Sequence, residues 1–291
     1  MVRQVQHKAL YDASVLRLVQ IALAEDIGSG DITSEATIPA DRRARATLVA
    51  KSPGVICGLP VAALVFHTVD PSTAWEELAS DGDTVAAGTL LAHIYGSARS
   101  LLAAERTALN FLQRMSGVAT LTRQYVEAVA GTGARILDTR KTIPGWRLLD
   151  KYACRIGGAD NHRQGLFDMV LIKDNHIAAA GGIEAALAAV RQVWEEGRIR
   201  IEIEVQSLSE LERALACGGF HRIMFDNFSL EELRRGVALV NRRYETEASG
   251  GVRLETVRAI AETGVDYISV GALTHSAPAL DIAMDIAIAR R

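Results

Sequence analysis

From about residue 131 onward, short apolar runs alternate with amphipathic stretches of helical period. The apolar runs predict six strands, over 135–137, 169–172, 199–205, 222–225, 244–248 and 267–270. The stretches between them predict helices over 183–195, 208–217, 230–242 and 254–262. This alternation predicts a parallel sheet with helical crossovers. Six strands are fewer than the eight of a closed barrel, so a doubly wound sheet and an incomplete barrel both remain open.

The first part of the chain has a mixed pattern. Apolar positions at helical spacing predict a helix over 13–24, and short strand-like pieces follow, such as 44–50. A long helical pattern covers 100–129, with an interruption expected near Ser116-Gly117. The sequence therefore predicts a mixed α/β region ahead of the regular alternation.

Composition excludes several classes of protein. The 291 residues include 32 Lys+Arg and 35 Asp+Glu, a balance that argues against a nucleic-acid binder with a basic surface. The longest apolar run, 59–69, is too short to span a bilayer, and residues 1–11 lack the apolar stretch of a signal peptide. The three cysteines are widely spaced with no C-x-x-C, which favours buried thiols in a reducing cytoplasm over a zinc or disulfide framework. We therefore expect a cytoplasmic protein without nucleic-acid or membrane partners.

Charged residues or glycine turns follow nearly every predicted strand. In parallel α/β folds, ligands bind at the carboxyl ends of the strands, so these residues are expected to share one site. The cations Arg140, Lys141 and Lys173, with the segment Asn161-His162-Arg163, suit carboxylates or phosphates. Any one of these positions is more often a solvated loop charge, and the functional interpretation depends on their convergence.

Acidic residues and glycines complete the pattern. Glu204 and Asp226 are hard oxygen ligands of the kind that Mg²⁺ prefers beside substrate phosphates. Glu202 and Glu204 share a strand face, however, and one of them could simply be exposed or form a structural pair. The turns Ser249-Gly250-Gly251 and Val270-Gly271-Ala272 each precede a helical stretch and permit close approach of a phosphate. Together these features indicate a phosphorylated, Mg²⁺-bound substrate with a second anionic partner.

Several long motifs resemble the quinolinate phosphoribosyltransferase family, and the similarity extends from about residue 20 to 285. The main ones are Asp138-Thr139-Arg140-Lys141-Thr142, Gly157-Gly158-Ala159-Asp160-Asn161-His162-Arg163, Leu171-Ile172-Lys173-Asp174-Asn175-His176, Phe225-Asp226-Asn227, Ala248-Ser249-Gly250-Gly251 and Ser269-Val270-Gly271-Ala272-Leu273-Thr274-His275-Ser276. The resemblance implies transfer of a phosphoribosyl group from phosphoribosyl pyrophosphate to quinolinate. The products would be nicotinate mononucleotide, pyrophosphate and carbon dioxide, in the biosynthesis of NAD.

The resemblance also implies an architecture. It points to an N-terminal α/β sandwich domain over 1–115 and an incomplete, open α/β barrel over 116–275. A C-terminal helix over 280–290, within the segment 276–291, is expected to pack back on the first domain. The family similarity further implies a homodimer or larger assembly, Mg²⁺ as the metal, and no organic cofactor.

Residue roles follow from the same resemblance. Arg140, His162 and Arg163 would grip the two carboxylates of quinolinate, and Arg106 would reach the same pocket from the other subunit. Lys141 and Lys173 would contact quinolinate or the pyrophosphate donor, with Glu204 and Asp226 near the ribose and its Mg²⁺. Ser249, Gly250 and Gly271 would cradle the 5′-phosphate, with His275 close by.

Two alternative functions remain open beside this hypothesis. The first is a phosphoribosyltransferase that acts on nicotinate or another pyridine carboxylate without decarboxylation. The second is a non-catalytic protein that senses phosphoribosyl compounds. Four cationic positions, Arg106, Arg140, His162 and Arg163, favour a diacid over the first, and intact Glu204, Asp226 and Lys173 argue against the second.

Overall fold

The computed structural model describes residues 12–193 and 198–288, and its contacts divide the chain into two units. Among these residues, unit 1 contains 12–123, 143–158 and 277–288, and unit 2 contains the rest of 124–276. The first stretch of unit 1 ends at residue 123, and the segment 143–158 returns to unit 1 from the middle of the chain. The end of the helix predicted over 183–195 lies outside the described residues.

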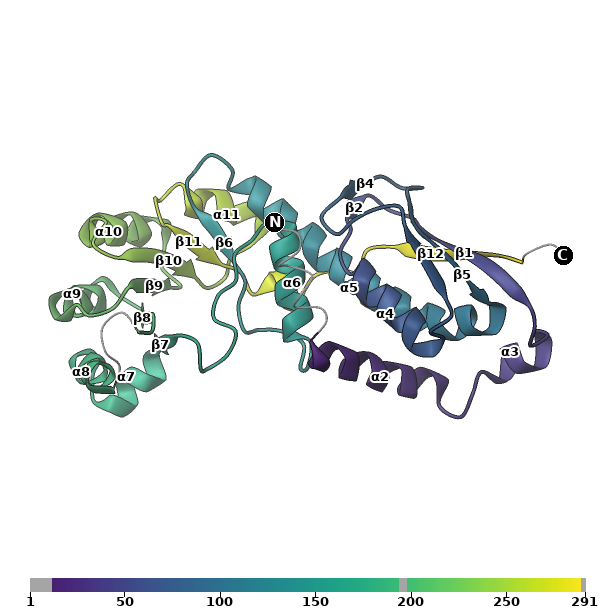
Figure 1. Cartoon of the computed structure of the whole chain (residues 1–291). Helices are drawn as coiled ribbons and strands as arrows, with labels where there is room; N and C mark the ends of the chain where they lie inside the picture. Colours follow the sequence, from purple (N-terminus) through teal and green to yellow (C-terminus); the bar gives the residue numbers. More distant parts are fainter. Residues whose placement is uncertain (1–11, 194–197, 289–291) are drawn as a thin grey trace. The chain divides into compact units, whose positions relative to one another are not determined.

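Unit 1 is built on an antiparallel four-stranded sheet, in the order β12-β1-β5-β3 (Figure 1). Its strands are β1 (Arg43–Ala50), β3 (Ala74–Glu77), β5 (Leu90–Ser97) and β12 (Ile282–Ile288), and a second small sheet pairs β2 (Gly54–Val55) with β4 (Thr84–Val85). Ala44, Ala46 and Leu48 of β1 are buried at alternate positions, because successive side chains of a strand point to opposite faces. One face of this sheet therefore belongs to the core of the unit.

The helices of unit 1 are α2 (Ala13–Ile27), α3 (Ile32–Thr37), α4 (Leu59–Val69), α6 (Arg147–Gly157) and the part of α5 (Ala98–Ala128) up to residue 123. α4 begins where the backbone N–H groups of Gly58 and Leu59 donate to the Asp81 carboxylate at 2.9–3.0 Å. These bonds satisfy donors that the first turn of a helix leaves without partners. Within the described residues, the structure has no helix both long and apolar enough to cross a bilayer.

The predicted C-terminal helix is wrong, because this segment forms the strand β12. β12 pairs antiparallel with β1, from Ala44 opposite Ile288 to Ala50 opposite Ile282, and the end of the predicted helix lies outside the described residues. The backbone groups along the free edge of β1 are satisfied by this pairing. The expected location on unit 1 holds, but the secondary structure does not.

The interruption expected at Ser116-Gly117 is also absent, since α5 runs without a break through both residues. Their role is close packing within unit 1. The Ser116 hydroxyl accepts the N–H of Cys57 at 3.0 Å and lies 3.1 Å from the carbonyl oxygen of the same residue. A Cβ at Gly117 would lie 1.9 Å from the carbonyl oxygen of Pro278, so only glycine fits there.

Unit 2 is a parallel six-stranded sheet in the order β6-β11-β10-β9-β8-β7. Its strands are β6 (Arg135–Leu137), β7 (Val170–Ile172), β8 (Ile201–Val205), β9 (Arg222–Asp226), β10 (Glu245–Ser249) and β11 (Tyr267–Ser269). Helices α7 (Asp174–Ala180) and α8 (Ile183–Val193) both follow β7. One helix then follows each later strand: α9 (Leu208–Cys217), α10 (Leu230–Val240), α11 (Leu254–Ala261) and α12 (Ala272–His275). In the described residues β6 and β7 are edge strands that do not pair with each other, which confirms the open barrel.

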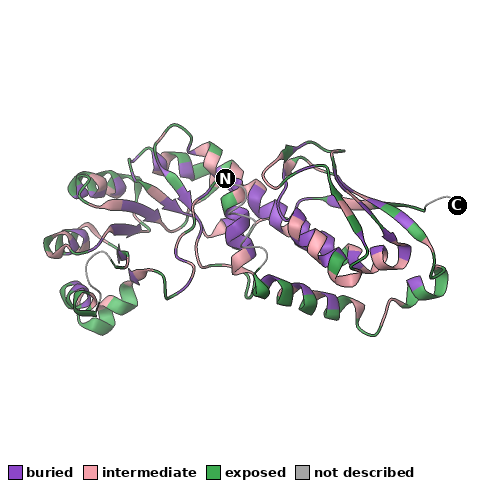
Figure 2. Ribbon diagram, in the orientation of Figure 1, coloured by how far each residue is buried: buried purple, intermediate pink, exposed green. Residues whose placement is uncertain are grey.

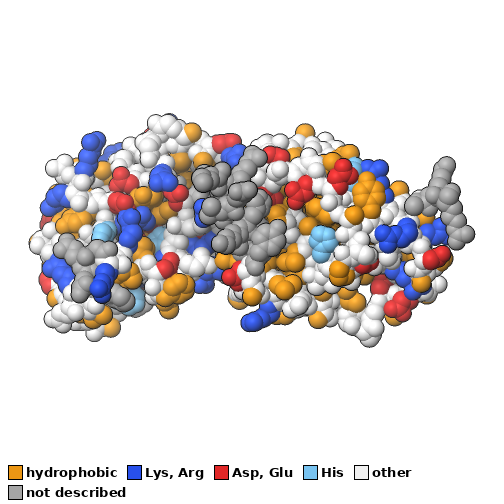
Figure 3. Space-filling model, in the orientation of Figure 1, with side chains coloured by type: hydrophobic (Ala, Val, Ile, Leu, Met, Phe, Trp, Pro, Cys, Tyr) orange, Lys and Arg blue, Asp and Glu red, His pale blue; other side chains and the backbone are white. Residues whose placement is uncertain are grey.

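The strands of unit 2 are mostly buried, as Figure 2 shows. Side chains such as Ile203, Ile223 and Phe225 are fully buried on one face. Charged side chains occupy alternate positions of the same strands, and Glu202 and Glu247 are also fully buried. On the face of the molecule visible in Figure 3, acidic and basic side chains are interspersed, in keeping with the balanced composition. The segregation of charge lies inside unit 2, where all six strands end at the same edge.

Candidate active site

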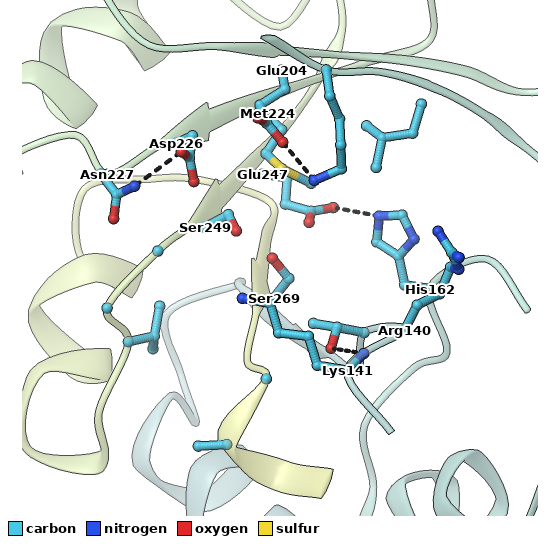
Figure 4. Close-up of a pocket in the computed structure, with 18 of the residues that line it drawn as sticks. Arg140, Lys141, His162, Glu204, Met224, Asp226, Asn227, Glu247, Ser249 and Ser269 are labelled. Atoms are coloured by element: carbon cyan, nitrogen blue, oxygen red, sulfur yellow. Dashed lines mark hydrogen bonds and ion pairs between the residues drawn. The ribbon is translucent and has the colours of Figure 1, made fainter. Parts of the chain in front are cut away.

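A cavity of about 760 Å³ lies at the carboxyl ends of the unit 2 strands (Figure 4). Each strand or the loop after it contributes lining side chains, as expected for a parallel sheet. Eleven of the twelve predicted site residues line it: Arg140, Lys141, His162, Arg163, Lys173, Glu204, Asp226, Ser249, Gly250, Gly271 and His275. The structure thus brings together residues that lie up to 135 positions apart in the sequence.

Arg106 is the predicted site residue that is missing from the lining. It lies on α5 in unit 1, where its side chain is exposed, and the described lining residues all belong to unit 2. Its expected role concerns a second subunit, which a single chain does not test.

The loops after β6 and before β7 position the cationic side of the cavity. Asp138, which is fully buried, accepts hydrogen bonds from the Asn161 side-chain amide at 2.6 Å and from the His162 backbone N–H at 2.8 Å. Arg163 donates from Nη1 to the Met169 carbonyl oxygen at 3.2 Å. A buried aspartate therefore connects the two segments that present Arg140 and Arg163.

Arg140 and Arg163 form a partly desolvated pair of positive groups. Burial lowers the pKa of Arg163, and the nearby charge of Arg140 lowers it further. The Nε atom of Arg140 is buried and has no hydrogen-bond partner among the described residues. Two guanidinium groups held close together, one with a buried donor to spare, are suited to a ligand that carries two negative charges.

The acidic side of the cavity comes from the ends of β8 and β9. Lys173, the residue after β7, places its Nζ 3.0 Å from Oε2 of Glu204, which is 6% exposed. Asp226 ends β9, and its Oδ2 accepts a hydrogen bond from the Asn227 amide at 2.9 Å. Both carboxylates face the cavity in Figure 4, at the edge opposite Arg140 and Lys141. Of the two glutamates on β8, neither is exposed.

Behind the cavity, His162 contacts a buried acidic pair that sequence reasoning missed as part of the site. The Nε2 atom of His162 lies 3.0 Å from Oε2 of Glu202 and 3.7 Å from Oε2 of Glu247, and its Nδ1 accepts the Arg163 backbone N–H at 2.8 Å. Nη1 of Arg222 donates to Glu247 at 2.9 Å. Nδ1 of His162 is therefore occupied by this hydrogen bond, and Nε2 lies within ion-pair distance of both buried carboxylates.

The Glu202–Glu247 pair has strongly perturbed ionisation. Burial raises the pKa of both carboxyl groups, and the charge of Glu202 raises that of Glu247 further. Arg222 opposes the shift in each case. Its guanidinium also lies 4.0 Å from the centre of the Tyr267 ring, so one buried arginine is held by both charge and aromatic contact.

The glycine turns after β10 and β11 form the remaining wall. Ser249 and Gly250 lie at the end of β10, and Gly271 precedes the short helix α12. The Thr274 hydroxyl of α12 donates to the Lys141 carbonyl oxygen at 2.7 Å, which connects this wall to the loop after β6. His275, at the end of α12, is exposed beside the cavity.

The cavity also includes residues outside the twelve candidate site residues. Gly251 and Ala272 belong to the predicted glycine turns, and the others are Thr139, Leu171, Met224, Asn227, Glu247, Val252, Arg253 and Ser269. Glu247 lies two residues before Ser249 on β10, and side chains at that spacing share a face of the strand. That spacing is the signal that could have identified Glu247.

In comparison with known proteins, the two parts of the chain match the two domains of a single family. Residues 31–116 match the N-terminal domain of quinolinate phosphoribosyl transferase, and residues 118–285 match its C-terminal domain. A decarboxylating quinolinate phosphoribosyltransferase, 1b of Nicotiana tabacum, is 47% identical over 286 residues, which cover 92% of this chain and 81% of the relative. The chloroplastic nicotinate-nucleotide pyrophosphorylase (carboxylating) of Arabidopsis thaliana is 46% identical, with coverages of 92% and 82%.

Solved structures agree. NadC from Streptococcus pyogenes has a TM-score of 0.90 and 40% identity, covering 94% of this chain and 96% of that one. The nicotinate-nucleotide pyrophosphorylase from Francisella tularensis has a TM-score of 0.88 and 39% identity, with the same coverages. The chain therefore belongs to the quinolinate phosphoribosyltransferase family.

Proposed function

We propose that this protein is a decarboxylating quinolinate phosphoribosyltransferase in NAD biosynthesis. It would convert quinolinate and phosphoribosyl pyrophosphate into nicotinate mononucleotide, pyrophosphate and carbon dioxide. The observation that carries the proposal is a single cavity with paired guanidinium groups on one side and carboxylates on the other, in a chain of this family. The printed names of the two relatives described above denote an enzyme of this reaction.

The cationic side suits quinolinate, a pyridine with two adjacent carboxylates. Arg140 and Arg163 would each meet one carboxylate, and the buried Nε of Arg140 would gain the partner that it lacks among the described residues. Lys141, exposed on the same loop, would contact quinolinate or the pyrophosphate donor. His162 lines the same side and would also fix the Arg163 backbone, since its Nδ1 accepts the Arg163 N–H.

The acidic side and the glycine turns suit the donor. The pyridine nitrogen attacks C1 of the ribose, and the bond from C1 to the pyrophosphate oxygen breaks with its electron pair leaving on pyrophosphate. Positive charge develops on the ribose ring, where Glu204 and Asp226 would stabilise it. Lys173 would approach the departing pyrophosphate, while Ser249, Gly250 and Gly271 would hold the 5′-phosphate beside His275.

Decarboxylation then follows on the same ring. The bond between C2 and its carboxylate breaks, carbon dioxide leaves, and the electron pair stays at C2, stabilised by the positive ring nitrogen. C2 then takes up a proton. The chain's task in this step is orientation, because the positive ring nitrogen stabilises the electron pair at C2 and no organic cofactor is needed.

The carboxylates also fit a divalent metal. Glu204 and Asp226 both line the cavity and offer the hard oxygen atoms that Mg²⁺ prefers, so they would hold the ion largely through water or the donor's own oxygens. Bound there, Mg²⁺ would offset negative charge on pyrophosphate.

A direct test supplies the protein with phosphoribosyl pyrophosphate, Mg²⁺ and quinolinate labelled in its 2-carboxylate. We expect release of labelled carbon dioxide and of pyrophosphate in equal amounts. A parallel reaction contains nicotinate in place of quinolinate. Turnover of nicotinate alone would overturn the proposal and favour a non-decarboxylating transferase.

The proposed assembly is a homodimer in which Arg106 reaches the cavity of the second subunit. Mixing the inactive variants Arg106→Ala and Arg140→Ala would test this sharing. Subunit exchange should restore about one quarter of wild-type activity, because half of the randomly formed dimers are mixed and each has one intact site of two. Failure to recover activity while mixed dimers form would contradict the sharing. We further propose a cytoplasmic location, in keeping with three widely spaced cysteines that form no C-x-x-C motif.

A further inference from the structure

Asn227, the residue after β9, has a left-handed backbone with φ +58°. Few residues other than glycine adopt this conformation, and asparagine is among those that tolerate it best. The backbone N–H of Asn227 donates to the Ser249 carbonyl oxygen at 2.9 Å, next to the pairing of Asp226 with Ser249. The conformation is thus fixed by the end of β10.

This backbone turns the Asn227 side chain toward Asp226. Nδ2 of Asn227 donates to Oδ2 of Asp226 at 2.9 Å, drawn as a dashed line in Figure 4. A carboxylate only accepts hydrogen bonds, so the amide nitrogen, and not the amide oxygen, must face Asp226. The bond fixes the orientation of the carboxylate without neutralising its charge.

The other side of the Asn227 amide lies against Gly250. A Cβ at Gly250 would lie 2.1 Å from Oδ1 of Asn227 and 2.6 Å from its Cγ. Any larger residue at position 250 would have to displace the amide. Gly250 therefore leaves the room that the Asn227 side chain occupies.

We propose that Asn227 is a positioning residue that holds the Asp226 carboxylate in its working orientation, and that Gly250 serves the same carboxylate by leaving room for Asn227. This inference rests on the proposed function. It connects the turn that would bind the 5′-phosphate to the carboxylate that would face the ribose, through one asparagine side chain.

The first test replaces the amide while keeping the backbone. Asn227→Gly tolerates positive φ and removes the bond to Asp226, and we expect kcat to fall by roughly 10–100-fold, as for other residues that orient a catalytic group. Quinolinate affinity, measured by calorimetric titration, should stay unchanged because the variant leaves Arg140 and Arg163 intact. Asn227→Asp keeps the shape but places a second carboxylate beside Asp226, and should lose more activity than Asn227→Gly.

Asn241→Gly is the matched control. Asn241 is also left-handed, with φ +47°, but it caps α10 and does not line the cavity, so this variant should keep wild-type kcat. Wild-type kcat in Asn227→Gly would overturn the positioning role, as would a loss of quinolinate affinity equal to the loss of kcat. An inactive wild-type protein would instead overturn the proposed function, so the two failures are distinguishable.

A double-mutant cycle tests the contact with Gly250. Gly250 has φ +96°, so Gly250→Ala carries backbone strain in every background, and the cycle cancels that common cost. We expect Gly250→Ala to reduce kcat by roughly tenfold more in the wild-type protein than in Asn227→Gly, where the obstructed amide is already gone. Equal losses in the two backgrounds would contradict the coupling.

Discussion

Replacing Glu247 with glutamine should change how stability depends on pH. Glu247 is fully buried beside Glu202, and burial together with that neighbouring charge raises its pKa from 4.5 to about 8. The folded carboxyl therefore binds its proton more tightly than the unfolded one. Its contribution to stability is complete below about pH 4.5 and is lost as the pH rises towards about 8. Glutamine stays neutral throughout, so Glu247→Gln should remove this part of the slope and leave the part due to Glu202, whose pKa burial raises to about 7.

The size of the effect follows from the pKa change. One pKa unit corresponds to about 1.4 kcal/mol, and a single group with these two values loses on the order of 3 kcal/mol of folding free energy between about pH 5 and pH 8. Arg222 limits the loss by pairing with the charged carboxylate at 2.9 Å. For a chain of this size, we expect the melting temperature of the wild-type protein to fall by about 5–10 °C relative to Glu247→Gln over that range.

Thermal unfolding of both proteins, recorded by circular dichroism across this pH range, measures the difference. Glu184→Gln is the control, because its hydrogen bonds to Arg213 lower the pKa of Glu184 to about 2. That carboxylate is ionised at both ends of the range, so its removal should shift the curve without changing its slope. Parallel curves for wild type and Glu247→Gln, or a wild-type protein that gains stability with pH, would refute the reasoning.

Three further substitutions have defined outcomes. Arg140→Ala should weaken quinolinate binding by roughly 100-fold, whereas Arg135→Ala, at an exposed arginine of β6 that does not line the cavity, should bind normally; unchanged calorimetric affinity for the first would contradict its role. Glu204→Gln should lower kcat by roughly 100-fold with little change in KM, and steady-state kinetics showing a pure KM effect would count against electrostatic stabilisation. Arg114→Met should cost about 3 kcal/mol by leaving Asp150, 1% exposed, without its cation at 3.1 Å, and an unaltered melting temperature would disprove that.

Most of the fold was predictable because the hydrophobic patterns of its strands and of its helices differ clearly. The six strands of unit 2 were all anticipated, since apolar runs and amphipathic helices alternate there. The C-terminal strand was not, because its composition suits a helix and the edge of β1 that it satisfies lies more than 230 residues earlier. The residues Ile282, Met284, Ile286 and Ile288 nevertheless alternate with the period of a strand.

Site residues that directly follow a strand could be predicted from the sequence, whereas those within a strand could not. Lys173 and Asp226 stand at strand ends, so parallel topology alone places them together. Glu247 lies in mid-strand, where a charged residue resembles an exposed position and only the folded barrel makes it internal. The geometry of Asn227 depends on its backbone angle and on Gly250, neither of which a sequence pattern specifies.

Unit 1 is assembled from separate segments of the chain, and this has a consequence for synthesis on the ribosome. Its sheet is complete only when β12 joins β1, so the edge of β1 lacks its partner while the whole of unit 2 is being made. An unpaired edge strand invites association with other chains. Truncations that remove β12 should therefore give aggregated protein, even though they leave the sequence that lines the cavity of unit 2 intact. Pairing of β12 with β1 is thus a late step in folding, and it completes the sheet of unit 1.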